Sequence, residues 1–95
     1  MLDNSTLDKI IDHYGRGHQI DKAVEELGEL IVAIAKERGS QKLRQVDPHH
    51  RADVIEEIAD VKVIIAQLEI IYSCRDEVER MVDYKIQRTL EEMEK

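Results

Sequence analysis

The sequence predicts an all-α fold in which one domain, residues 1–95, forms a four-helix bundle-like protomer. First, four glycines and one proline are few for 95 residues, which favours a small number of long elements over many short strands and turns. Second, apolar residues recur at helical spacing along most of the chain. Third, Trp and Phe are absent and only three Tyr are present, so the core must consist of aliphatic side chains.

The first helix is predicted over residues 5–14. Ser5, followed three residues later by Asp8, resembles a capping box in which Asp replaces the usual Glu or Gln. Gly15 or Gly17 is expected to end this helix, because glycine readily adopts the left-handed conformation that follows many helices.

The second helix is predicted over residues 18–38, with Gly39 as the glycine that ends it. A polar connector, residues 39–50, follows and contains the only proline. Two interpretations of this connector stay open: a solvated loop, or a mobile basic flap that closes over phosphates. Its adjacent histidines have no Cys or third His nearby, so we do not expect a zinc site. The apolar residues of the second helix fall in one arc: Ile20, Ala23, Val24, Leu27, Ile31 and Ile34.

The third helix is predicted to begin between Pro48 and Asp53 and to continue to about Tyr72. Proline suits the first turn of a helix, because its missing N–H has no intrahelical partner there. Ser73 and Asp76 repeat the Ser-x-x-Asp start signal, and the fourth helix is predicted to run from there to residue 93.

The net charge and the cysteine count limit the partners and the compartment. The charge is −7, so no basic excess exists to release counterions from nucleic acid or from an anionic membrane. The most apolar stretch, residues 54–72, contains five charged residues, which excludes an ordinary membrane span. Cys74 is the only cysteine, and the first ten residues lack a signal-peptide pattern. We therefore expect a cytoplasmic protein without nucleic-acid or membrane partners, whose small core favours self-association.

Three carboxylates gather on the second helix, on the side opposite its apolar arc. Glu25 and Glu29 are four residues apart and Glu26 is three residues from Glu29, and Lys22 and Lys36 share this side. Like charges at this spacing repel by a few tenths of a kcal/mol, so the cluster does not stabilise the helix. From this helix alone, a solvated face and half of a divalent-cation site both remain open.

The residue pattern of the third helix favours the interpretation of these acids as part of a divalent-cation site. It is apolar on two opposite sides, which is typical of a helix packed between neighbours; one side carries Val54, Ile58, Val61, Ile65, Leu68 and Tyr72, and the other Ala59, Val63, Ala66 and Ile70. Glu57 and Asp60 project beside Ile64, Leu68 and Ile71 rather than on the polar strip. Ionised and unpaired acids would cost several kcal/mol there, and a divalent cation would compensate them. Carboxylates without His or Cys select Mg²⁺, with Mn²⁺ as the other candidate.

The two acidic motifs together resemble a known family. Glu25-Glu26-x-x-Glu29, followed after 27 residues by Glu57-x-x-Asp60, resembles the signature of the MazG-like all-α nucleoside triphosphate pyrophosphohydrolases. "HQIDKAVEELGELIVAIAKERG" and "VIEEIADVKVIIAQLEIIY" look like the two central helices of that family, and "YKIQR", residues 84–88, resembles the basic part of its last helix.

This resemblance implies a Mg²⁺-dependent enzyme that hydrolyses a nucleoside triphosphate to the monophosphate and pyrophosphate, with its site between the second and third helices. It also implies assembly as a homodimer or homotetramer. Carried over by position, the metal ligands are Glu26, Glu29, Glu57 and Asp60. Glu25 is then the catalytic candidate, which either binds a second ion or orients and deprotonates the attacking water.

The basic residues near these motifs are candidates for substrate binding. Lys22 shares the acidic face, where a phosphate contact and a salt bridge to the glutamates are both open. Lys85 and Arg88 resemble the phosphate-binding residues of the family's last helix. A role at the surface is also open, because basic residues near a helix C-terminus interact favourably with the helix dipole. His18 and Gln19 precede the motif where such proteins often form the base pocket.

The sequence leaves two other functions open. A phosphoribosyl-ATP pyrophosphohydrolase shares the fold and the acidic motifs, but "EEIADVKVII" departs from the small-residue pattern of that branch. A non-catalytic helical interaction module would pair Glu57 and Asp60 with Lys or Arg from a neighbouring helix instead of a cation. A ferritin-like di-iron site is not expected, because Glu-x-x-His pairs are absent.

Overall fold

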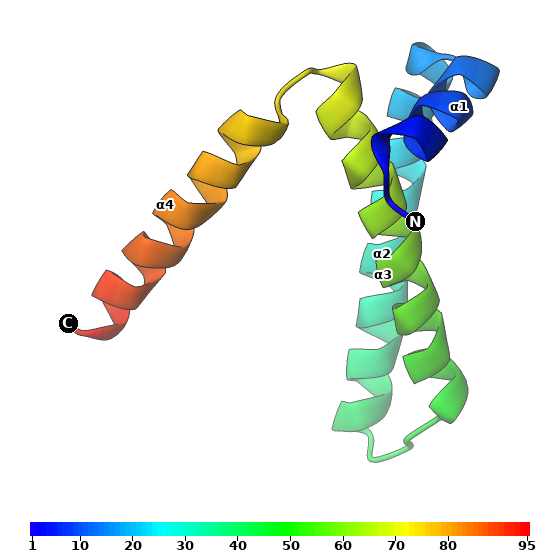
Figure 1. Ribbon diagram of the computed structural model, residues 1–95. Helices are drawn as coiled ribbons and strands as arrows, with labels where there is room; N and C mark the ends of the chain where they lie inside the picture. Colours follow the sequence, from blue (N-terminus) through cyan, green and yellow to red (C-terminus); the bar gives the residue numbers. More distant parts are fainter.

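The computed structural model describes residues 1–95 and contains four helices and no strand, which confirms the all-α class (Figure 1). The helices are α1, Asn4–Tyr14; α2, Arg16–Lys42; α3, Pro48–Ile71; and α4, Arg75–Met93. No helix combines the length and the apolar character that crossing a membrane requires.

The start of α1 differs from the prediction, whereas its end agrees. Asp3, not Ser5, caps the helix, because its Oδ1 accepts a hydrogen bond of 2.8 Å from the backbone N–H of Thr6. Gly15 separates α1 from α2 with a φ of +92°, a conformation that an L side chain would strain. The bend at Gly15 folds α1 back across the other two helices.

The second helix is longer than predicted, so the connector is shorter. α2 continues through Gly39 to Lys42 and leaves only residues 43–47 between it and α3. Asp47 caps α3 by accepting a hydrogen bond of 2.9 Å from the backbone N–H of His49, and Pro48 occupies the first turn as predicted. The Oγ atom of Ser40 lies 2.6 Å from Nδ1 of His50, and this contact joins the end of α2 to the start of α3 beside the connector. A long basic flap is therefore absent from this structure.

The two long helices, α2 and α3, form an antiparallel hairpin, and α1 packs on both (Figure 1). Six apolar residues form the small core: Leu7, Ile11, Ala23, Ala33, Ile64 and Ile71. Two buried amides lie among them, and Nε2 of Gln19 donates a hydrogen bond of 2.7 Å to Oε1 of Gln67. This bond joins α2 to α3 inside the core, where an unpaired amide would be costly.

Most of the apolar arc of α2 is exposed in the single chain and only Ala23 of it is buried, contrary to what its hydrophobic periodicity suggests. Val24 is 70% exposed and Ile31 is 68% exposed, whereas Glu26 is only 8% exposed. The side of α2 that meets α3 carries Ala23, Glu26 and Ala33. The outward arc, defined here as Val24, Leu27, Ile31 and Ile34, is therefore left without a partner in the single chain.

The last helix, α4, does not close a four-helix bundle within the chain. It begins at Arg75 after Cys74 as the N-cap, receives no side-chain cap from Ser73 and contains no buried residue. It packs on the end of α3, and Nη2 of Arg75 donates a hydrogen bond of 2.8 Å to Oδ1 of Asn4 at the start of α1. Figure 1 shows α4 leaving the hairpin as a separate arm. The radius of gyration is 16.6 Å, against about 12 Å for a compact chain of this length. Its exposed apolar side chains are Val78, Met81, Val82, Ile86, Leu90 and Met93.

Candidate metal centre

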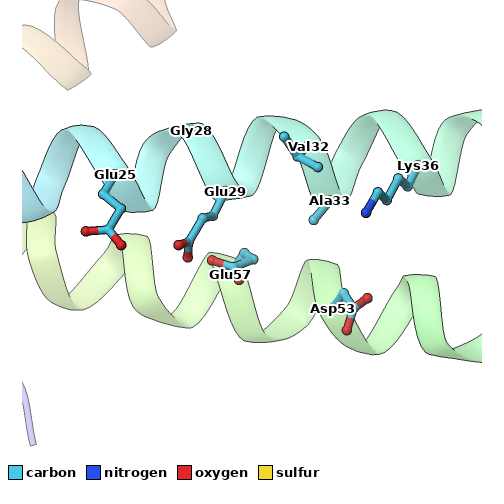
Figure 2. A pocket seen from close by; sticks show the side chains of 8 residues that line it. All are labelled: Glu25, Gly28, Glu29, Val32, Ala33, Lys36, Asp53 and Glu57. Carbon is cyan, nitrogen blue, oxygen red and sulfur yellow. The ribbon is translucent and has the colours of Figure 1, made fainter.

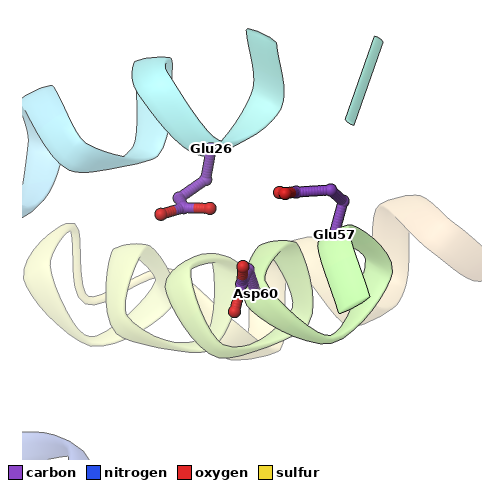
Figure 3. Close-up of side chains that lie close together, drawn as sticks. All are labelled: Glu26, Glu57 and Asp60. Carbon is purple, nitrogen blue, oxygen red and sulfur yellow. The ribbon is translucent and has the colours of Figure 1, made fainter. Parts of the chain in front are cut away.

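Three carboxylates from two helices meet between α2 and α3 (Figure 3). Glu26 of α2 and Glu57 and Asp60 of α3 each offer one oxygen, and these oxygens all lie within 4.8 Å of one another. Glu26 is buried, while Glu57 and Asp60 are half-buried. We call these three residues the carboxylate cluster.

Helical spacing explains why the acids of α3 point into the helix pair. Glu57, Asp60, Ile64, Gln67 and Ile71 follow one another at intervals of three or four residues, so they share one face of the helix. Ile64, Gln67 and Ile71 are the buried residues of α3. Glu57 and Asp60 extend the same buried face, as their position beside Ile64 and Ile71 predicts.

Two oxygens of the cluster lack any hydrogen-bond partner. Oε2 of Glu26 and Oε2 of Glu57 are both buried and unpaired, although a buried carboxylate oxygen normally has a donor or a counter-ion. A third such oxygen belongs to Glu37, which is not part of the cluster. Carboxylates that lie close together and have buried oxygens without partners fit a divalent cation with oxygen ligands.

The electrostatics of Glu57 agree with this interpretation. Burial raises the pKa of Glu57 above its ordinary value, and the nearby negative charges of Glu29, Asp60 and Glu26 raise it further. Like charges disfavour ionisation of one another unless a cation stands between them. Within this chain the cluster is therefore short of positive charge.

Glu25 and Glu29 lie beside the cluster rather than in it. Both are exposed, and Figure 2 shows them projecting from α2 toward α3. With Glu57 they line a pocket of about 520 Å³, which we call the main groove. Its other lining residues are Gly28, Val32, Ala33, Lys36 and Asp53.

A smaller pocket lies on the other side of the cluster. It has a volume of about 190 Å³, and Gln19 and Gln67 contribute their amides to its wall, so we call it the amide pocket. Glu26 and Asp60 border the amide pocket, whereas Glu57 borders the main groove. The cluster thus stands between two open spaces, each of which could hold part of one ligand.

Lys22 is engaged with the acids of its own helix. Its Nζ lies 3.2 Å from Oε1 of Glu26 and 3.8 Å from Oε2 of Glu25. The hydrogen bond to Glu26 and the charges of both glutamates raise the pKa of Lys22. Of the two roles left open by the sequence, the salt bridge is the one present in this structure.

Lys85 and Arg88 are not brought to the carboxylates. Both are exposed on α4, and α4 makes its contacts with the end of α3 and the start of α1 rather than with α2. The turn at residues 72–74 directs α4 away from α2, so within one chain these basic side chains stay apart from the cluster.

Three polar residues that line the groove or the pocket were not among the site candidates expected from the sequence: Lys36, Asp53 and Gln67. Asp53 precedes Glu57 by four residues and Gln67 follows Asp60 by seven, so helical spacing could have placed them near the acids. Lys36 follows Glu29 by seven residues and shares its side of α2 for the same reason.

Comparison of the chain with models of protein families, with curated proteins and with solved structures finds no match.

Proposed function

We propose that this protein is a Mg²⁺-dependent, MazG-like nucleoside triphosphate pyrophosphohydrolase of the cytoplasm, which releases the nucleoside monophosphate and pyrophosphate. The observation that carries the proposal is that Glu26 and Glu57, whose carboxylates approach each other and Asp60 within 4.8 Å, each have a buried oxygen without a hydrogen-bond partner. Cys74 is a free thiol, as suits a reducing compartment.

The carboxylate cluster would hold the cation, with Glu29 as a further ligand at its edge. Carboxylate oxygens without nitrogen or sulfur donors favour Mg²⁺ or Mn²⁺ over zinc. A bound cation of this kind neutralises the charge of a triphosphate and lowers the pKa of a coordinated water molecule. The chain's own residues supply the negative charge that retains the ion between α2 and α3.

Glu25 is the candidate general base. It is exposed at the main groove on the same helix face as Glu29, so a water molecule in the groove can reach its carboxylate. A carboxylate in this position can accept the proton of the attacking water and hold that water in line with the phosphorus. The main groove, at about 520 Å³, is large enough for the phosphate part of a nucleotide.

Assembly as a dimer or tetramer belongs to the same proposal. The outward arc of α2 and the apolar side of α4 are both exposed, and soluble monomers rarely leave such large apolar surfaces open. A second copy that covers these surfaces could also bring Lys85 and Arg88 to its partner's groove. These two residues would then bind phosphate between subunits rather than within one chain.

A non-catalytic interaction module is the second candidate, because the same exposed apolar surfaces would serve an adaptor equally well. It predicts no response of the cluster to Mg²⁺, since paired charges from a partner would neutralise the acids. Phosphoribosyl-ATP hydrolysis is the alternative within the enzyme class and differs only in the substrate.

The decisive experiment measures pyrophosphate release from a panel of canonical and modified nucleoside triphosphates and phosphoribosyl-ATP, with and without Mg²⁺. Loss of one outer-shell partner already lowers the activity of metal enzymes by about 10–100-fold, so Glu57→Gln and Asp60→Asn are each expected to cost about 100-fold or more. Glu56→Gln is the matched control, because Glu56 is the exposed neighbour of Glu57 outside the site. Absence of release from every substrate, or release that both site variants leave unchanged, excludes the proposed function.

A further inference from the structure

The main groove contains one basic side chain, Lys36. Figure 2 shows its ammonium group directed from α2 back toward Ala33, on the side of the groove where Asp53 lies across on α3. The ion pairs of the structure involve the amino terminus, Lys22 and Lys95. Lys36 is therefore a cation in the groove without an ion-pair partner.

The position of Lys36 relative to the acids follows from helix geometry. Lys36 lies seven residues after Glu29, which is nearly two turns, so both side chains are on one face about 10 Å apart along the axis. Side chains of a helix lean toward its N-terminus, and those of Lys36 and Glu29 lean in the same direction (Figure 2). The groove thus has the glutamates at one end and the unpaired ammonium group of Lys36, with Asp53 across from it, at the other.

We infer that Lys36 binds the terminal phosphate of the substrate, so that the pyrophosphate half of the triphosphate lies along the main groove. This inference rests on the proposed function and names the side of the carboxylate cluster on which the leaving group sits. A phosphate oxygen needs a donor or a cation wherever it leaves bulk water, and a lysine ammonium provides both as a point charge.

The distribution of charge between the two pockets supports this direction. The only cation of the amide pocket is Lys22, whose charge already pairs with Glu26 at 3.2 Å. The rest of that pocket consists of the neutral Gln19 and Gln67 amides, the aliphatic Val63 and Ile64, and the carboxylates of Glu26 and Asp60. The main groove contains more acids, but its lysine is the one positive charge of the two pockets that no carboxylate already pairs with, so a phosphate oxygen can bind it without displacing an ion pair.

A structural role for Lys36 makes a different prediction. Asp53 lines the same groove from α3, so Lys36 could stabilise the hairpin by pairing with Asp53 instead of binding phosphate. In that case Asp53→Asn and Lys36→Gln would have the same effect on every property. Under the phosphate-binding role, only the lysine variant weakens the binding of pyrophosphate.

The experiment compares Lys36→Gln, Lys36→Arg and Asp53→Asn, with Lys62→Gln as the control because Lys62 is exposed on α3 and lines no pocket. Calorimetry measures the dissociation constants of inorganic pyrophosphate and of the nucleoside monophosphate in the presence of Mg²⁺, and kinetics measure KM and kcat. A charge-assisted hydrogen bond corresponds to roughly 10–100-fold in affinity. Lys36→Gln is expected to weaken pyrophosphate binding and raise KM for the triphosphate by about this factor.

The expected pattern has four further parts. Affinity for the monophosphate stays unchanged in Lys36→Gln, Lys36→Arg restores most of the pyrophosphate affinity, Asp53→Asn does not weaken pyrophosphate binding because it removes a negative charge from the groove, and Lys62→Gln behaves as wild type. Unchanged pyrophosphate affinity in Lys36→Gln, or an equal loss in Asp53→Asn, overturns the inference while hydrolysis by the wild type still supports the proposed function. If the wild type hydrolyses no triphosphate, the proposed function itself fails, and the assignment of Lys36 fails with it.

Discussion

The ammonium group of Lys22 lies 3.2 Å from Oε1 of Glu26, while Oε2 of the same carboxylate is buried without a partner. One oxygen of Glu26 is thus paired within its own helix and the other is unpaired, in a carboxylate that lies close to Glu57 and Asp60. Glu26 is only 8% exposed at this position. Within the chain, Lys22 therefore supplies a counter-charge to one oxygen of Glu26 and the other oxygen is left without one.

Replacing Lys22 by methionine is expected to destabilise the metal-free protein more than the protein in Mg²⁺. Without the ammonium group, Glu26 is a buried, ionised and unpaired acid, and a bound divalent cation supplies the missing counter-charge. The check is the melting temperature of wild type and Lys22→Met, each with EDTA and with Mg²⁺. An equal loss of stability under both conditions would contradict a cation site at Glu26.

Mg²⁺ is expected to raise the melting temperature of the wild type through the carboxylate cluster. A ligand at ten times its dissociation constant stabilises the folded state by about 1.4 kcal/mol, which corresponds to roughly 5–10 °C for a domain of this size. Glu57→Gln should abolish the shift and Glu56→Gln should retain it. A shift that persists in Glu57→Gln would place the ion elsewhere.

The pKa of Glu57 predicts a pH dependence in the absence of divalent cations. Because burial and the neighbouring acids raise this pKa above the ordinary value of 4.5, protonation favours the folded state. The stabilising effect of the proton is complete below the ordinary value and is lost as the pH rises through the raised value. At neutral pH the ionised Glu57 therefore opposes folding.

Glu57→Gln should consequently be more stable than wild type at neutral pH in EDTA, and the difference should disappear as the pH falls toward 4.5. Thermal melts of both proteins across this range provide the measurement, and Glu56→Gln controls for the loss of one charge. A variant that is less stable than wild type at neutral pH would show that Glu57 has a stabilising partner.

Substitutions of two isoleucines are expected to affect different properties, because one lies in the outward arc of α2 and the other lies in the core. Ile31 is 68% exposed in the single chain and Ile64 is 3% exposed. Ile64→Ala should cost about 2–5 kcal/mol of folding stability, as is usual for a buried isoleucine. Ile31→Lys should instead lower the oligomeric state measured by sedimentation and leave the helical content unchanged. A monomeric wild type, or an assembly that Ile31→Lys leaves intact, would show that this arc is not an interface.

Helical periodicity correctly predicts which face of α3 carries the two acids, because spacing along a helix determines the direction of each side chain. Glu57 and Asp60 were expected beside Ile64 and Ile71, and they do lie on the face of α3 that meets α2. Spacing along a helix determines which residues share a face, and the acidic pair is too close to buried positions to point elsewhere.

The same periodicity could not reveal what covers each face. The apolar arc of α2 looked like a core face, but of its residues only Ala23 is buried, and it shares the contact with α3 with Ala33 from outside the arc. Gly39 was predicted to end α2, yet the helix continues, because a glycine costs only about 1 kcal/mol within a helix and Gln41 and Lys42 are good helix formers. The direction of α4 depends on the turn at Ser73, whose φ is +50°, and no apolar pattern encodes that angle.

The outward-facing apolar arc of α2 has a consequence for which positions tolerate substitution. In a solitary globular protein, exposed positions accept most residues and buried ones accept few. If a second copy covers the arc, Val24 and Ile31 should be as restricted in a library of variants as Ile64, while Glu56 and Lys62, which are also exposed, should vary freely. The pattern of permitted residues would then map the covered surface of the assembly without a structure of the complex.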